Sequence, residues 1–169
     1  LPDNIIEYSS LNEKTKTSVI YDWRKKLDDS WGSPFTVDGL RWNTITHYVL
    51  ASQYKKGFPD FYKEFSLDSE SDLSTSLELA KAATSKSGKL ENKQIRPENV
   101  TVDADYFTIG TEPRKDQERY IALEAKFTQN LDLQRVLMET KRAKLVKFIR
   151  RTDPEPDTLL MQLRKKISL

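Results

Sequence analysis

The sequence offers few side chains for acid–base or metal chemistry other than carboxylates. Its 169 residues include one histidine and no cysteine, which removes thiolate metal sites, thiol nucleophiles and a histidine zinc cluster. We therefore predict no metal and no cofactor. Asp103 and Asp105 are two residues apart in a segment, 100–109, whose apolar residues alternate as in a strand, so their carboxylates would share one face. Such a pair could assist acid–base chemistry, and a solvated surface pair is the alternative reading.

Three tryptophans could stack a nucleobase, an interaction worth about 1–3 kcal/mol per base. Trp42 ends an apolar segment and is expected in the core, whereas Trp23 and Trp31 lie in irregular, charged segments and are the stronger ligand candidates. Arg24 follows Trp23 and Arg41 precedes Trp42, so cations able to hold a phosphate lie next to possible stacking platforms. This combination is typical of a nucleotide site.

Length and composition limit what must position these residues. The length fits a single domain, 1–169, possibly part of a longer protein because the chain starts at Leu1. A net charge of +2 and a pI near 8.6 neither require nor exclude a phosphate-bearing partner. No apolar run approaches the roughly 20 residues of a membrane span, and no signal-peptide pattern is present. We expect a cytoplasmic or nucleocytoplasmic protein that does not enter a membrane.

The segment around Trp42 has the clearest local signals. Asp38-Gly39 separates Phe35-Thr36-Val37 from Leu40-Arg41-Trp42, and this dipeptide supplies the positive φ angles of a two-residue hairpin turn. Asn43 or Thr44 can then cap a helix whose apolar residues occupy more than one stripe, ending near Gly57 and Pro59. We predict a hairpin running into a largely buried helix.

Other elements follow from periodicity and punctuation. The pattern predicts a strand at 4–8, a short aromatic-rich helix at 61–65, a helix from Ser71-Asp72 through Ala80, an exposed loop at 85–99, a strand at 100–109, two consecutive helices through Phe127 and Thr140, and a last helix capped by Asp157.

Four segments in order resemble one protein family. Trp42-Asn43-Thr44-Ile45-Thr46-His47-Tyr48 resembles the W-P-T-S-E-H-Y helix of the NADAR (YbiA-like) N-glycosidases. In chain order, the four segments are Ile5-Ile6-Glu7-Tyr8-Ser9, Pro34-Phe35-Thr36-Val37-Asp38-Gly39 running into Trp42-Asn43-Thr44, Ala122-Leu123-Glu124-Ala125-Lys126-Phe127-Thr128-Gln129-Asn130, and Leu159-Leu160-Met161-Gln162-Leu163-Arg164. The resemblance implies a compact, α-rich α+β domain with a few short strands, including one hairpin. It also implies hydrolysis of N-glycosidic bonds in riboflavin-pathway ribosylamino intermediates or ADP-ribosylated nucleobases, and therefore a ribonucleotide-like ligand.

The chain departs from the family at the positions that carry its chemistry. Thr46 occupies the position of the family's glutamate, and a hydroxyl does not take a proton at neutral pH as a carboxylate does. The family's W-G-D-G-type loop falls within 146–157, which has no tryptophan, and Asp105-Tyr106 is the nearest match to its Asp-Trp pair. His47 matches the family's histidine. Its role is that of a hydrogen-bonded core residue or, alternatively, of a ligand contact.

Three functions remain open from the sequence. The leading hypothesis is a catalytically degenerate domain that binds a nucleotide, a nucleoside or a cap-like RNA 5′ end, through Trp23, Trp31, Arg24, Arg41, Trp42, Thr46 and His47. The first alternative is a divergent N-glycosidase in which Asp103, Asp105 or a loop carboxylate replaces the glutamate. The second is a structural or assembly domain of a larger viral or cellular protein.

Overall fold

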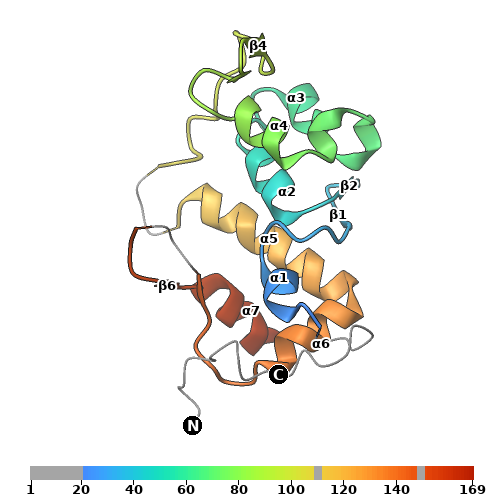
Figure 1. Ribbon diagram of the computed structural model, residues 1–169, viewed down its shortest axis with the longest axis vertical. Helices are drawn as coiled ribbons and strands as arrows, with labels where there is room; N and C mark the ends of the chain where they lie inside the picture. The colour runs from blue at the N-terminus through green and yellow to red at the C-terminus, as the bar shows by residue number, and fades with distance from the viewer. Residues whose placement is uncertain (1–20, 109–111, 148–150) are drawn as a thin grey trace. The chain divides into compact units, whose positions relative to one another are not determined.

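The computed structural model of the chain describes residues 21–108, 112–147 and 151–169 (Figure 1). Its contacts divide the chain into two compact units: unit 1 comprises Leu1–Asp28 and Phe127–Leu169, and unit 2 comprises Asp29–Lys126. The described residues form seven α-helices, and their strands pair into three two-stranded antiparallel sheets. The predicted α-rich α+β class is confirmed.

Unit 2 begins with the predicted hairpin. Strand β1 (Phe35–Val37) pairs with β2 (Leu40–Trp42) in antiparallel register, with Phe35 opposite Trp42. Asp38 and Gly39 form the turn with φ angles of 57° and 74°, the left-handed values that a two-residue turn between twisted strands requires. The Trp42 ring is fully buried, and its indole N–H donates to the Val37 carbonyl oxygen at 3.1 Å. Both the hairpin and the core position of Trp42 are confirmed.

Helix α2 (Ile45–Ser52) starts as predicted at Thr44, whose Oγ1 accepts a hydrogen bond from the His47 backbone N–H at 3.0 Å. It packs against α3 (Pro59–Glu64) and α4 (Leu77–Ala83), drawn beside it in cyan and green in Figure 1. Aromatic rings fill the space after its C-terminal end: Tyr54, Phe61 and Phe65 pack edge to face or stacked, 4.9–6.2 Å apart. The core of unit 2 therefore surrounds α2.

The predicted helix from Ser71 through Ala80 is interrupted. A 3-10 turn, η2 (Asp72–Ser74), follows Ser71, and α4 starts anew after Ser76. The two serines explain the break, because each hydroxyl accepts a backbone N–H two or three residues ahead and so caps its own element. Another 3-10 turn, η1 (Leu67–Ser69), precedes them.

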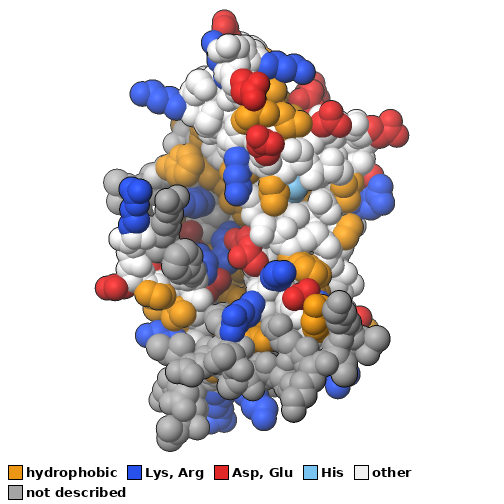
Figure 2. Space-filling model, in the orientation of Figure 1, with side chains coloured by type: hydrophobic (Ala, Val, Ile, Leu, Met, Phe, Trp, Pro, Cys, Tyr) orange, Lys and Arg blue, Asp and Glu red, His pale blue; other side chains and the backbone are white. Residues whose placement is uncertain are grey.

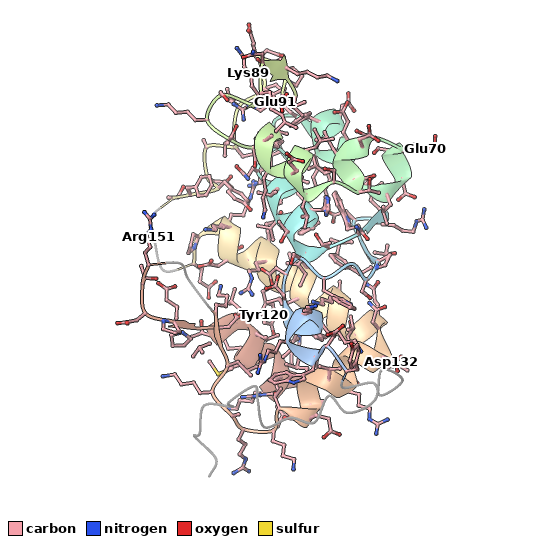
Figure 3. All side chains as sticks on the ribbon, in the orientation of Figure 1. Glu70, Lys89, Glu91, Tyr120, Asp132 and Arg151 are labelled. Atoms are coloured by element: carbon pink, nitrogen blue, oxygen red, sulfur yellow. The ribbon has the colours of Figure 1, made fainter. Side chains whose placement is uncertain are left out.

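The segment 85–99, predicted as a loop, contains a short hairpin in which β3 (Lys89–Leu90) pairs with β4 (Lys93–Gln94), two residues in each strand. Side chains of the described residues are drawn in Figure 3, where the labels Glu70 and Glu91 mark turn residues with φ of 59° and 55°. These turns connect elements and contribute no residue to the site described below.

The predicted strand at 100–109 is wrong. Residues 101–103 have no regular structure and 104–107 form turns. The Asp103 N–H donates to the Gln53 carbonyl oxygen at 2.7 Å, and the Asp103 carboxylate accepts the backbone N–H groups of Lys56 and Gly57, each at 2.9 Å. In a strand, the Asp103 backbone would bond to a neighbouring strand, but here Asp103 bonds to the turn after α2 instead. The alternation of Val100 and Val102 does not reveal this partner.

The long helix α5 (Arg114–Gln129) and then α6 (Leu131–Glu139) confirm the two consecutive helices. In unit 1, α1 (Trp23–Leu27) packs against α6. Strands β5 (Val146–Lys147) and β6 (Glu155–Pro156) pair before α7 (Thr158–Ile167), which Asp157 caps as predicted. The strand predicted at 4–8 lies outside the described residues. None of the described helices combines the length and apolar character needed to cross a membrane.

Candidate functional site

The N-terminal end of α2 is bordered by a loop that starts at Asp29. The Asp29 carbonyl oxygen accepts the Thr46 backbone N–H at 3.0 Å, and the Ser33 N–H donates to the Asn43 carbonyl oxygen at 3.0 Å. We call residues 29–33 the Trp31 loop. These two backbone contacts hold the Trp31 loop against the residues that lead into α2, although the sequence separates the two segments.

An ion pair fixes the first residue of the Trp31 loop to α5. Arg119 donates to both carboxylate oxygens of Asp29, from Nε to Oδ2 at 2.8 Å and from Nη2 to Oδ1 at 3.1 Å. Such a bidentate pair restricts orientation as well as distance. The Asp29 side chain remains 29% exposed and the Arg119 side chain 11%. The loop is therefore held at a defined position against two helices of unit 2.

Trp31 itself remains open. Its side chain is partly exposed, and among the residues that the structure describes it makes no ring–ring, cation–ring or hydrogen-bond contact. Thr46, in the first turn of α2, is also partly exposed. A large, partly exposed ring without an aromatic neighbour among the described residues leaves a face on which a planar ligand can stack.

The neighbouring His47 belongs to the interior. Its side chain is fully buried and Nδ1 lies 2.8 Å from Thr44 Oγ1. Burial lowers the pKa of His47, and the nearby Ser76 backbone acts in the opposite direction without reversing the shift. The imidazole is bonded through Nδ1 to the N-cap residue of α2, while its buried Nε2 has no hydrogen-bond partner among the described residues. This geometry agrees with a core histidine hydrogen-bonded through one ring nitrogen.

A second polar cluster, which sequence reasoning missed, lies on the other side of α2. The Lys55 ammonium contacts Tyr48 Oη at 2.7 Å, Asp38 Oδ2 at 2.9 Å and Glu118 Oε1 at 3.1 Å. Tyr62 Oη donates to Asp38 Oδ2 at 2.7 Å. We call these five residues the Lys55 network. It joins the hairpin turn, α2, α3 and α5 of unit 2.

Charge states in the Lys55 network are fixed by its own contacts. Burial alone would lower the pKa of Lys55, but hydrogen bonds to Tyr48, Asp38 and Glu118 outweigh it and raise the pKa. Burial raises the pKa of the Tyr48 and Tyr62 phenols well above its usual value. For Asp38, the hydrogen bonds from Lys55 and Tyr62 overcome burial and lower the pKa. The network therefore holds the Lys55 cation, the Asp38 anion and two neutral phenols at neutral pH.

The predicted carboxylate pair does not face the Trp31 loop. Asp103 is held by the two backbone N–H groups described above and by Arg114 Nη2 at 2.8 Å, and its side chain is 4% exposed. Asp105 pairs with Lys56 and with Arg114 Nη1, and the Lys56 hydrogen bond is the main reason for its lowered pKa. Arg114 also donates to the Ser52 carbonyl oxygen, at the C-terminal end of α2. Both carboxylates thus hold the turn that carries Lys55.

No protein-family model and no curated protein matches the chain. The NMR structure of the E. coli protein YbiA superposes with a TM-score of 0.64, covering 99% of this chain and 87% of that chain, at 21% sequence identity. This chain has a YbiA-like fold. At that identity the likeness shows the fold and no more.

The remaining predicted residues occupy different environments in the YbiA-like fold. Trp23 is 1% exposed within α1, so the expectation of an irregular segment with an accessible ring is wrong. Arg24 lies 5.8 Å from the Trp23 ring centroid, in unit 1. Arg41 is engaged by Asp68, through its backbone N–H at 2.7 Å and its Nε at 3.3 Å. The buried Trp42 ring packs against Tyr48 and Tyr62 at 5.1 and 5.0 Å and forms the floor of the Lys55 network.

The face drawn in Figure 2 carries described Lys and Arg side chains as well as Asp and Glu side chains. Among the described residues, no group of three or more His, Cys, Asp or Glu side chains is placed to hold a metal ion. The feature that singles out the Trp31 loop is its partly exposed aromatic ring.

Proposed function

We propose that this YbiA-like domain binds a nucleotide-like ligand at the Trp31 loop and does not hydrolyse the ligand's N-glycosidic bond. The observation that carries the proposal is the partly exposed Trp31 ring on a loop whose backbone is anchored to the start of α2. An anchored loop loses little freedom on binding, and stacking of a base on the ring contributes about 1–3 kcal/mol. Nucleotide, nucleoside and cap-like RNA 5′ end are the ligand classes that such a platform suits.

Hydrolysis is disfavoured because the described carboxylates around α2 are already engaged. Water attack on an N-glycosidic carbon needs a carboxylate that accepts a proton near neutral pH. Thr46 has no such group. Asp38 and Asp105 have lowered pKa values, through Lys55 and Lys56 respectively, and are correspondingly weak bases. Asp103 is 4% exposed and bonded to Arg114. These contacts support binding without turnover.

The test combines affinity with product analysis. Purine nucleotides, ADP-ribose and 5′-capped oligonucleotides are titrated into the whole chain by isothermal calorimetry, and each sample is then analysed for free base by chromatography. We expect saturable binding and no free base. Trp31→Ala should weaken binding at least about tenfold, the loss of about 1.4 kcal/mol.

Phe107→Ala is the matched control, because Phe107 is also an exposed aromatic of unit 2, at 57% exposure, but lies on the segment that packs near Lys115. It should bind like the unaltered chain. Equal loss of binding in both variants would contradict the assignment to the Trp31 loop. Absence of binding across the whole panel would reject the proposed function and favour the structural or assembly role.

A specific observation keeps a second function in view, a divergent N-glycosidase. Asp29 carries a carboxylate that is 29% exposed, and its own carbonyl oxygen contacts Thr46, the residue at the family's glutamate position. Arg119 uses one lone pair of each carboxylate oxygen and leaves the others for a water. Free base released from a ribosylated substrate, and abolished by Asp29→Asn, would be the signature of this enzyme and would refute binding without turnover.

A further inference from the structure

Asn43 places its carboxamide at the edge of the Trp31 loop. It lies between β2 and the cap residue Thr44, and its carbonyl oxygen accepts the Ser33 N–H. Its side-chain Oδ1 lies 3.5 Å, and its Nδ2 4.0 Å, from the position that a Cβ would occupy on Gly32. The carboxamide therefore borders the residue that directly follows Trp31, and the absence of a side chain on Gly32 leaves it uncovered there.

The Asn43 carboxamide has no partner within the described part of the chain. Its side chain is partly exposed, and neither oxygen nor nitrogen makes a hydrogen bond to a described residue. It consequently offers two N–H donors and one acceptor. Thr44, one residue later, has both its hydroxyl and its carbonyl committed to α2. The contrast between adjacent residues makes Asn43 the open hydrogen-bonding group at the Trp31 loop, bordering Gly32, the residue after Trp31.

We propose that Asn43 selects the base, and that the base is adenine. This rests on the proposed function, since it requires a base stacked on Trp31. A carboxamide fits the N6/N7 edge of adenine with two hydrogen bonds: Nδ2 donates to N7 and Oδ1 accepts from the N6 amino group. The ring of Trp31 supplies the stacking face, and the carboxamide supplies the pattern that distinguishes one base from another.

The same pattern disfavours the other bases. The corresponding edge of guanine presents two acceptors, N7 and O6, so Asn43 Oδ1 would face a second oxygen. Pyrimidines have no N7 and present a smaller face to the tryptophan. A correct bidentate pair is worth about 1–3 kcal/mol of discrimination, which corresponds to roughly 5- to 150-fold in affinity.

The experiment compares AMP, GMP, CMP, UMP and 7-deaza-AMP by isothermal calorimetry on the whole chain and on Asn43→Asp. For the unaltered chain we expect AMP to bind about tenfold more tightly than GMP and than 7-deaza-AMP, which lacks the N7 acceptor. Asn43→Asp retains the size of the side chain but loses the donor. Asn43→Asp should bind AMP and 7-deaza-AMP equally, with the affinity that the unaltered chain has for 7-deaza-AMP.

The outcomes separate this inference from the proposed function. Equal binding of all four bases, with loss of affinity in Trp31→Ala, overturns the role of Asn43 and leaves the nucleotide site intact. A preference for AMP over 7-deaza-AMP that persists in Asn43→Asp likewise overturns it. No binding of any nucleotide sinks both proposals. Asn43→Ser, which keeps a hydroxyl and cannot form the bidentate pair, repeats the test if thermal unfolding shows that Asn43→Asp is not folded.

Discussion

Two polar regions flank α2 in unit 2, and they differ in whether their groups are satisfied. In the Lys55 network, each ammonium proton has an acceptor on Tyr48, Asp38 or Glu118. In the Trp31 loop, the backbone is anchored but the Trp31 ring and the Asn43 carboxamide have no partner among the described residues. Buried charged groups require partners within the protein, whereas partly exposed polar groups remain available to a ligand. We therefore expect the Lys55 network to contribute to stability and the Trp31 loop to contribute to binding.

Trp31 and Trp42 show the same contrast within one residue type. Both belong to unit 2, Trp31 before the hairpin and Trp42 at its last position, yet Trp42 is fully buried against Tyr48 and Tyr62 while Trp31 is partly exposed. Substituting each residue separates stability from binding. The predictions below challenge that separation, starting from the largest effect.

Trp42→Ala should lower the free energy of unfolding by about 3–5 kcal/mol, because removing a large buried ring loses transfer free energy and leaves a cavity. Trp31→Ala should lower it by under about 1 kcal/mol, since a partly exposed ring leaves no buried void. Urea denaturation followed by circular dichroism measures both. Similar losses in the two variants would show that Trp31 is a core residue and would remove the basis of the binding site.

Lys55→Met should destabilise the chain by about 3 kcal/mol, because it leaves the Glu118 carboxylate, 6% exposed, without its cation. Urea denaturation measures this loss, and the dependence of the free energy of unfolding on urea concentration should stay unchanged. Lys56→Met is the matched control: this neighbouring lysine is 63% exposed, and a surface ion pair contributes under about 1 kcal/mol.

A double variant sharpens the Lys55 prediction. Adding Glu118→Gln to Lys55→Met removes the unpaired buried charge, so part of the lost stability should return. If Lys55→Met and Lys56→Met have the same small effect, the Lys55 network is not a stabilising closure and its contrast with the Trp31 loop fails.

The fold was largely predictable where the signal is local. Asp38-Gly39 encodes its turn in two adjacent residues, and Thr44 caps α2 with a hydroxyl that reaches three residues ahead. The segment 100–109 failed because its hydrogen bonds go to Gln53, Lys56 and Gly57 rather than to a strand. Alternation of apolar residues indicates an extended segment and says nothing of its partner.

The residues of the candidate site were also predictable only where the signal is local. Trp31 was singled out by residue type and Thr46 by its position in the family resemblance. The backbone hydrogen bond between Asp29 and Thr46 that joins their segments is not encoded in side-chain patterns. The Lys55 network was missed because Glu118 is 70 residues from Tyr48. A weak signal existed: Lys55 follows Tyr48 by seven residues in the sequence, about two helical turns, which places both on one face.

His47, buried at the N-terminal end of α2, gives a pH-dependent prediction. Its folded pKa lies below the unfolded value of 6.5 because of burial, so the unfolded chain binds more protons as the pH falls through that value. Stability should therefore be complete above about pH 6.5 and fall below it, by up to about 1.4 kcal/mol per pH unit. Urea midpoints from pH 7.5 to 5.5 measure the slope. His47→Gln should have a smaller slope over this interval, and an unchanged slope would assign the titration to another group.

Asp38→Asn should have the smallest effect and tests where the Lys55 network meets solvent. Asparagine tolerates the positive φ of this turn and keeps an acceptor for Lys55 and Tyr62, so the change removes little besides charge. Because the Asp38 side chain is 46% exposed, solvent screening should limit the loss at pH 7 to about 1 kcal/mol.

The pKa of Asp38 is lower in the folded chain than its unfolded value of 3.8. Its contribution to the free energy of unfolding is therefore complete above pH 3.8 and is lost as the pH falls through the folded pKa. The difference between the unaltered chain and Asp38→Asn should therefore shrink between pH 5 and about pH 3. Urea denaturation at both pH values measures this difference. A loss as large as that of Lys55→Met would mean that Asp38 is as deeply enclosed as Glu118, and the closed region would then extend to the hairpin turn.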